Sequence, residues 1–112
     1  MVLLSKFERS DVGRGKKVML GSMSFDNQSQ AKDFFKAMLN RYIPGERISA
    51  EDSLHLGSLF ERHPEYATKI GPGIRHFEVM PADYGTKCFC AIRTDGSKEG
   101  FSYIKCVTQK VD

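Results

Sequence analysis

The chain of 112 residues lacks any long apolar run. No stretch approaches the roughly 18 consecutive apolar residues that a membrane-spanning helix needs. The opening Met1-Val2-Leu3-Leu4 is followed at once by polar and charged residues, so it is too short for the apolar core of a signal peptide. These two absences predict a cytoplasmic protein with no membrane partner.

The chain also contains few cysteines, namely Cys88, Cys90 and Cys106. A structural zinc site uses four ligands, usually in two paired turns, and no histidine lies at ligand spacing beside these thiols. The odd count and the lack of an export signal favour reduced thiols in a reducing compartment. We therefore expect three structural cysteines in predicted strands, with no metal and no cofactor.

Net charge is small, at +3, but it is unevenly distributed. Residues 1–17 carry five basic and two acidic side chains, residues 18–86 carry seven and nine, and residues 87–112 carry five and three. Basic ends around an acidic middle would suit a polyanionic partner. An imbalance of this size fits a solvated surface with no partner equally well.

Two stretches have the apolar spacing of helices. The first follows a capping residue at Asp26 or Asn27 and stops before Pro44-Gly45. Its stripe consists of Ala31, Phe34, Phe35, Met38, Leu39 and Tyr42. The second begins after Ser49 and ends near Pro64, where a short helix to about Lys69 begins.

Strand patterns surround and follow these helices. Short apolar pieces around Gly21-Ser22 indicate a small N-terminal hairpin, and Ile74 to Val79 alternates as a strand does. Residues 87–107 predict a hairpin around Thr94-Asp95-Gly96-Ser97, with Asp-Gly favouring a type I′ turn. The fold prediction is α+β, an antiparallel sheet of three main strands (plus the small N-terminal hairpin) covered on one face by two helices. We expect residues 1–16 to form a flexible basic segment and residues 17–112 to form a single domain.

No motif of an enzyme is complete. A Cys–His pair is plausible only if the fold brings His55, His63 or His76 to a cysteine. Gly71-Pro72-Gly73 follows a helix and leads into a strand, which is the reverse of a phosphate-binding loop. We therefore predict no catalytic residues, and a hydrolytic or thiol enzyme is a minor alternative.

Basic and aromatic residues in the second half suggest a binding surface instead. Aromatic side chains beside cations on a sheet can stack bases and hold phosphates, although they can equally be core residues under the helices. The candidate nucleic-acid-binding residues are Arg62, His63, Lys69, Arg75, Arg93 and Lys105, with Tyr103 as the stacking residue. The alternative is that Lys69 and Arg93 only pair with acids such as Glu65, Glu78 or Asp95.

Several of these positions resemble a known family, typified by the plant Defective Chloroplasts and Leaves protein and with bacterial and phage members. The matching pieces cover about residues 17 to 107: Ala31 to Tyr42, Arg62-His63-Pro64, Lys69-Ile70-Gly71-x-Gly73-Ile74, Thr94-Asp95-Gly96, and Phe101-Ser102-Tyr103-x-Lys105-Cys106. The last three recur in this order and spacing.

The resemblance implies an α+β domain without established catalysis. Plant relatives are linked to chloroplast ribosomal RNA processing, and a similar domain ends the largest subunit of a plant-specific RNA polymerase. No plastid transit peptide is expected here, so a plastid role does not transfer. The function prediction is a non-catalytic module associated with nucleic acid, RNA more than DNA. The main alternative is a protein–protein interaction module that acts with RNA or DNA machinery.

Overall fold

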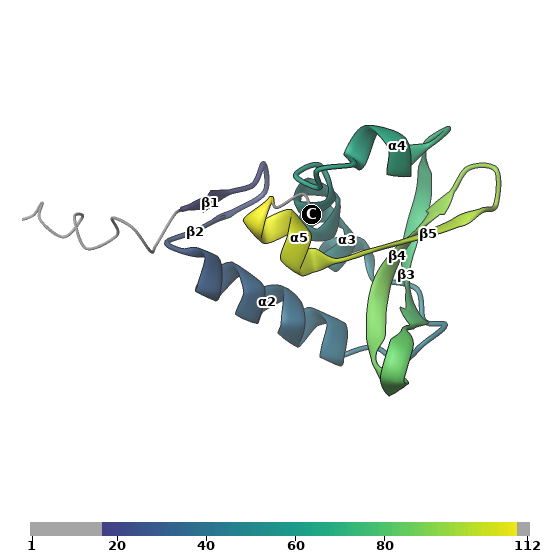
Figure 1. Ribbon diagram of the computed structural model, residues 1–112, viewed down its shortest axis with the longest axis horizontal. Helices are drawn as coiled ribbons and strands as arrows, with labels where there is room; N and C mark the ends of the chain where they lie inside the picture. The colour runs from purple at the N-terminus through teal and green to yellow at the C-terminus, as the bar shows by residue number, and fades with distance from the viewer. Residues whose placement is uncertain (1–16, 110–112) are drawn as a thin grey trace, which may run out of the picture.

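The computed structural model describes residues 17–109, so the predicted basic segment 1–16 lies outside the described residues (Figure 1). The elements follow in the order β1 (Val18–Met19), β2 (Ser24–Phe25), α2 (Gln28–Asn40), α3 (Ala50–Phe60), α4 (Tyr66–Ile70), β3 (Ile74–Pro81), the 3-10 turn η2 (Asp83–Gly85), β4 (Lys87–Arg93), β5 (Lys98–Phe101) and α5 (Tyr103–Thr108). None of these helices has the length and apolarity to cross a bilayer.

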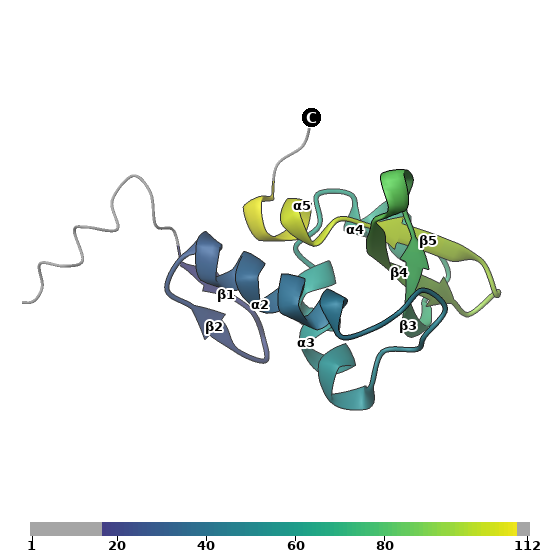
Figure 2. The same ribbon diagram turned by 90° about the horizontal axis from the view of Figure 1, so that it is seen from below.

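The predicted α+β fold is confirmed. β3, β4 and β5 form an antiparallel sheet with β4 in the centre, and β1 pairs with β2 in a separate small hairpin. Figures 1 and 2 both place α2, α3 and α5 on the same side of the three-stranded sheet. The core fills the space between these helices and the sheet.

α2 forms where its caps and apolar stripe predict it. The Asn27 side chain accepts a hydrogen bond from the Gln30 N–H at 2.9 Å, and the Gln30 side chain accepts one from the Asp26 N–H at 3.1 Å. Four residues of the stripe are buried: Ala31, Phe35, Met38 and Leu39. The Phe35 ring is fully buried and packs edge-on against Phe34, with the ring centroids 5.0 Å apart.

α3 carries the aromatic contact that joins helices to sheet. Ser49 caps the helix by accepting a hydrogen bond from the Asp52 N–H. Phe60 is the last residue of α3, and its ring stacks on Phe101 of β5 with centroids 4.3 Å apart and meets Phe77 of β3 edge-on at 6.0 Å. Offset and edge-on aromatic pairs add stability beyond the area they bury, so this cluster fixes α3 on the sheet.

The turn of the closing hairpin differs from the prediction. Gly96 alone among its residues has a positive φ, of 89°, so the predicted type I′ turn is wrong. The Gly96 N–H donates to the Arg93 carbonyl, and the Arg93 N–H donates to Ser97. This is a three-residue loop in which glycine takes the left-handed position, the next commonest hairpin connection.

The last predicted strand is also too long. β5 ends at Phe101, and Ser102 caps α5 by accepting a hydrogen bond from the Lys105 N–H at 3.2 Å. Tyr103, Lys105 and Cys106 therefore lie on a helix, not on a strand of the hairpin. α5 packs against α2 and α3, where Cys106 and Val107 are fully buried.

Candidate functional site

An ion cluster joins α4 to the closing hairpin. Lys69 Nζ donates to Glu99 Oε2 at 2.7 Å and to the Gly100 carbonyl at 3.2 Å. Arg93, at the end of β4, donates to the other oxygen of the same carboxylate. The hydrogen bond from Lys69 is the main cause that lowers the pKa of Glu99. Lys69 and Arg93 thus pair with an acid, but the acid is Glu99, on β5.

The glycine-rich turn after α4 lies directly on this cluster. Gly71 has a φ of 54°, and a Cβ at this position would lie 2.7 Å from Arg93 Nη1. The Thr94 N–H donates to the Gly73 carbonyl at 3.0 Å. Only glycine allows both the backbone angle and the close approach at Gly71. The turn between α4 and β3 is therefore held against the tip of the hairpin.

Arg62 and His63 serve the packing of α5 and α4. Arg62 Nε donates to the Cys106 carbonyl at 3.0 Å, and Arg62 Nη2 donates to the Val107 carbonyl at 2.8 Å. These carbonyls belong to the last turn of α5, whose acceptors have no partner within the helix. His63 is 5% exposed, and its Nδ1 accepts a hydrogen bond from the Glu65 N–H at 3.0 Å.

Three predicted site residues meet in one surface pocket of about 290 Å³ between α4, β5 and α5. We call it the α4–α5 pocket, and it is lined by His63, Glu65, Lys69, Cys88, Gly100, Phe101, Ser102 and Lys105. Lys105 is exposed and has no ion pair among the described residues. Burial lowers the pKa of His63, and the positive charge of Lys69 lowers it further, with a smaller contribution from Lys105. The pocket therefore holds two lysines and one carboxylate, Glu65, and of the two lysines only Lys105 lacks an ion pair among the described residues.

Arg93, Arg62, Arg75 and Tyr103 do not line this pocket. Arg93 reaches the pocket's edge only through Glu99, and Arg62 is bound to α5. Arg75 is exposed and donates to the Thr94 carbonyl at 3.1 Å, near the hairpin tip. Tyr103 is half-buried and packs edge-on against Phe89, with centroids 6.2 Å apart. The structure thus joins His63, Lys69 and Lys105 and separates the other four.

A family model described as "Protein of unknown function (DUF3223)" matches residues 36–107. The chain belongs to this family. Protein DCL, chloroplastic, from Solanum lycopersicum is 31% identical to this DUF3223 member over 115 residues, which cover 89% of the chain and 50% of that protein. The predicted resemblance is therefore confirmed.

The DUF3223 domain also matches part of a much longer plant protein. DNA-directed RNA polymerase IV subunit 1 from Arabidopsis thaliana is 36% identical over 73 residues, which cover 64% of this chain and 5% of that subunit. The chain thus spans half or less of the length of these plant relatives. A solution NMR structure of an uncharacterized protein from Rhodospirillum rubrum has the same fold, with a TM-score of 0.76 and 46% identity over 85% of this chain and 91% of that one.

Glu99 is the main residue that sequence reasoning missed in this DUF3223 member. A signal for it exists, because strand alternation puts Glu99 on the same face as Phe101, and hairpin register puts it close to Arg93. Arg47 and His76, which line a second groove described below, were also not predicted as site residues.

The cysteines are dispersed over two kinds of element. Cys88 and Cys90 lie on β4, whereas Cys106 lies on α5, where burial raises its pKa to about 12. Within residues 17–109 no group of three histidine, cysteine or acidic side chains is placed to hold a metal ion. That the protein binds no metal stays a prediction, which elemental analysis can test.

Proposed function

We propose that the domain is a non-catalytic nucleic-acid-associated module, which binds RNA in preference to DNA and contacts a backbone phosphate at the α4–α5 pocket. The observation that carries the proposal is that Lys69 of α4 and Lys105 of α5 line the same pocket. Lysine serves phosphate as a mobile point charge. Ser102, which also lines the pocket, offers a hydroxyl that can donate to a phosphate oxygen.

The context of the relatives supports the same class of function. Two of them are the first subunits of DNA-directed RNA polymerases IV and V of Arabidopsis thaliana. The domain is a small fraction of each subunit, so a binding role within a larger nucleic-acid machine suits its size. RNA is the preferred polyanion here because the family resemblance points to RNA metabolism.

The chemistry of the pocket favours binding over catalysis. Burial raises the pKa of Cys88, so its thiol stays protonated and is a poor nucleophile. Nδ1 of His63 is already engaged by the Glu65 N–H. A thiol enzyme needs a thiolate beside an imidazole that is free to take its proton. The burial of Cys88 and the hydrogen bond to His63 Nδ1 both argue against these conditions.

Salt dependence of RNA binding tests this proposal. A fluorescent structured RNA and a duplex DNA are titrated with the wild type, Lys105→Ala and Lys36→Ala at several salt concentrations, and the anisotropy is followed. Lys36 is the matched control, since it is an exposed lysine on α2. Removal of one phosphate contact should reduce the slope of log K against log salt by about one unit.

We expect that reduction for Lys105→Ala and an unchanged slope for Lys36→Ala. Lys69→Ala is not a clean test, because it also removes a partner of Glu99. The absence of RNA binding at low salt would remove the proposal. So would equal slopes for all three proteins.

A further inference from the structure

β3 is an edge strand whose outer side is only half covered. Residues 45–48 run antiparallel beside its second half, and the last hydrogen bond joins the Ile48 N–H to the Phe77 carbonyl at 2.9 Å. The chain then turns away at Ser49 into α3. Along Ile74–His76, no strand among residues 17–109 pairs with the outer edge. A strand edge of this kind can pair with another extended segment.

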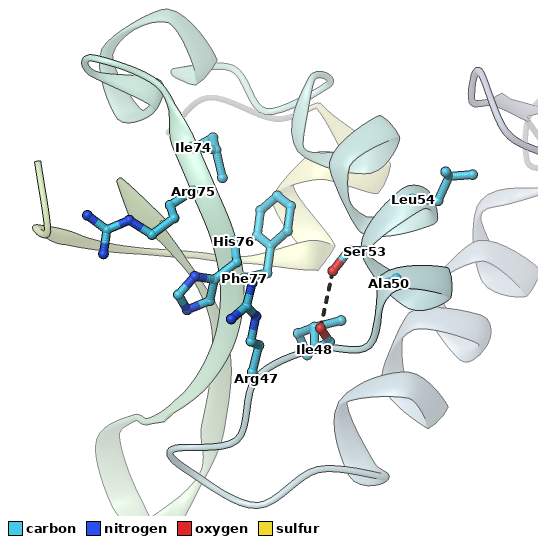
Figure 3. Close-up of a pocket in the computed structure, with 9 residues that line it drawn as sticks. All are labelled: Arg47, Ile48, Ala50, Ser53, Leu54, Ile74, Arg75, His76 and Phe77. Atoms are coloured by element: carbon cyan, nitrogen blue, oxygen red, sulfur yellow. Dashed lines mark hydrogen bonds between the residues drawn. The ribbon is translucent and has the colours of Figure 1, made fainter. Parts of the chain in front are cut away.

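A groove of about 550 Å³ opens beside this uncovered edge (Figure 3). Ile74 and Phe77 point from β3 toward α3. Leu54 of α3 also lines the groove and is 63% exposed, and its side chain points away from β3 in Figure 3. Arg75 and His76 point to the other side of β3. The edge therefore has an apolar side next to α3 and a basic side away from it.

The two arginines that line the groove lack partners of opposite charge among residues 17–109. Arg47 and Arg75 are exposed, and neither has an ion pair within the described part of the chain. No carboxylate lines the groove. His76 Nε2 is 2.7 Å from the Glu78 carboxylate, whereas its Nδ1 is buried and has no hydrogen-bond partner in residues 17–109. A buried ring nitrogen without a partner is costly, and a ligand group could satisfy it.

We propose that this groove binds an extended acidic segment of a partner protein, which adds to the outer edge of β3 at Ile74–His76. Successive side chains of an added strand point to opposite faces. One set would be apolar and would contact Ile74, and the alternate set would be acidic and would reach Arg47 and Arg75. The main-chain hydrogen bonds supply affinity, and the two rows of side chains supply specificity.

Charge argues against the two occupants that this chain itself could supply. Residues 1–17 carry five basic and two acidic side chains, so the arginines would repel this segment. The β3 edge of a second copy would bring the same arginines together. The groove shares no lining residue with the α4–α5 pocket. Peptide binding at this groove is therefore independent of phosphate binding at the α4–α5 pocket. It can be tested even if the protein does not bind RNA.

The test uses a labelled synthetic peptide in which aspartate alternates with leucine, titrated into the full chain and followed by anisotropy. A peptide with lysine in place of aspartate is the control for charge, and one with the same composition but clustered aspartates is the control for alternation. The double variant Arg47→Glu/Arg75→Glu should bind about tenfold more weakly, since two exposed ion pairs become repulsive. Lys36→Glu, on α2, should bind as the wild type does.

Amide NMR spectra locate the peptide. Binding should shift the amide signals of Ile74–Phe77 and Leu54 and slow hydrogen exchange at the β3 edge. Ile74→Ala gives a second, uncharged variant, which should also weaken binding. The proposal is overturned if the alternating peptide does not bind, if either control peptide binds equally well, or if the double variant keeps full affinity. Shifts confined to the α4–α5 pocket, or displacement of the peptide from this groove by RNA, would also overturn it.

Discussion

Replacement of Glu99 by glutamine tests whether the ion cluster holds α4 on the hairpin. In the wild type each carboxylate oxygen accepts from a different cation, Oε2 from Lys69 and Oε1 from Arg93. A glutamine side chain has nearly the same shape but offers one carbonyl oxygen and one NH₂ group, so one cation must face a donor. Glu99→Gln therefore removes one acceptor and the negative charge without leaving a cavity.

The magnitude follows from the exposure of the partners. The Lys69 and Arg93 side chains are 17% and 18% exposed, and that of Glu99 is 30% exposed. A hydrogen bond to a charged group contributes about 1.5–3 kcal/mol, whereas an exposed ion pair contributes about 0.2–1 kcal/mol. For this half-buried cluster we expect the free energy of unfolding to fall by about 2 kcal/mol. This is a large share of the roughly 5–15 kcal/mol of a domain.

Urea unfolding at neutral pH, followed by circular dichroism, measures the loss. Glu65→Gln is the matched control, because Glu65 is an exposed acid at the start of α4 and lacks an ion pair in the described residues. The midpoint should fall for Glu99→Gln at an unchanged slope and stay constant for the control. A change below about 0.5 kcal/mol, within the range of ordinary surface substitutions, would refute the structural role of the cluster.

The stability difference between the wild type and Glu99→Gln should depend on pH. The folded protein lowers the pKa of Glu99, so its stabilisation is fully present above the ordinary value of 4.5 and is lost as pH falls through the folded pKa. The stability difference between wild type and Glu99→Gln should therefore shrink as pH falls below about 4.5. A difference that grows in acid would contradict the assigned pairing.

Four further predictions concern the core, the turn and the cysteines. Phe35→Ala should cost about 3–5 kcal/mol, because the ring is fully buried, and a near-wild-type urea midpoint would contradict the helix-on-sheet packing. Gly71→Ala should lower the same midpoint by more than about 1 kcal/mol, since both the φ of 54° and the contact with Arg93 exclude a Cβ. Cys106, whose pKa is raised to about 12 by burial, should not react with Ellman's reagent at pH 8 until the protein is unfolded. Elemental analysis of protein purified without chelator should find no stoichiometric zinc or iron, and one tightly held equivalent would overturn the structural role assigned to the thiols.

The sequence predicts the elements whose signals are local. The α2 stripe, the caps at Asn27 and Ser49, and the buried pair Phe77 and Val79 of β3 each depend on residues close together in the chain, and all are confirmed. The strict alternation predicted for β3 is interrupted, because its register with β4 shifts between Ile74 and His76. α5 was missed because Ser102 to Val107 also fits strand alternation. A helix of six residues is unstable alone, so its stability comes from packing on α2 and α3, which no local pattern reveals.

The contacts of the candidate site residues also depend on tertiary structure, which the sequence alone did not predict. Composition and spacing identified the cations but not their partners. Arg62 was expected to face a ligand, yet it binds carbonyls of a helix that the sequence did not predict. Lys69 and Arg93 both pair with an acid, but that acid is Glu99 of β5, 30 positions beyond Lys69, and not one of the acids that the sequence suggested. The sequence shows which residues are charged. Only the tertiary structure shows which side chains of opposite charge or carbonyl groups they contact.

The position of α5 has a consequence for how the chain reaches its native state during synthesis. Val107 of α5 and Phe35 of α2 belong to the same buried cluster, so the core joins residues 72 positions apart in the chain. Until residues 103–108 leave the ribosome, the apolar sides of α2 and α3 lack one of their covers and are exposed to chaperones and to aggregation. Such distant contacts slow folding. Within a longer polypeptide, such as a polymerase subunit, a domain boundary placed at the end of β5 would therefore yield a chain that cannot complete its core.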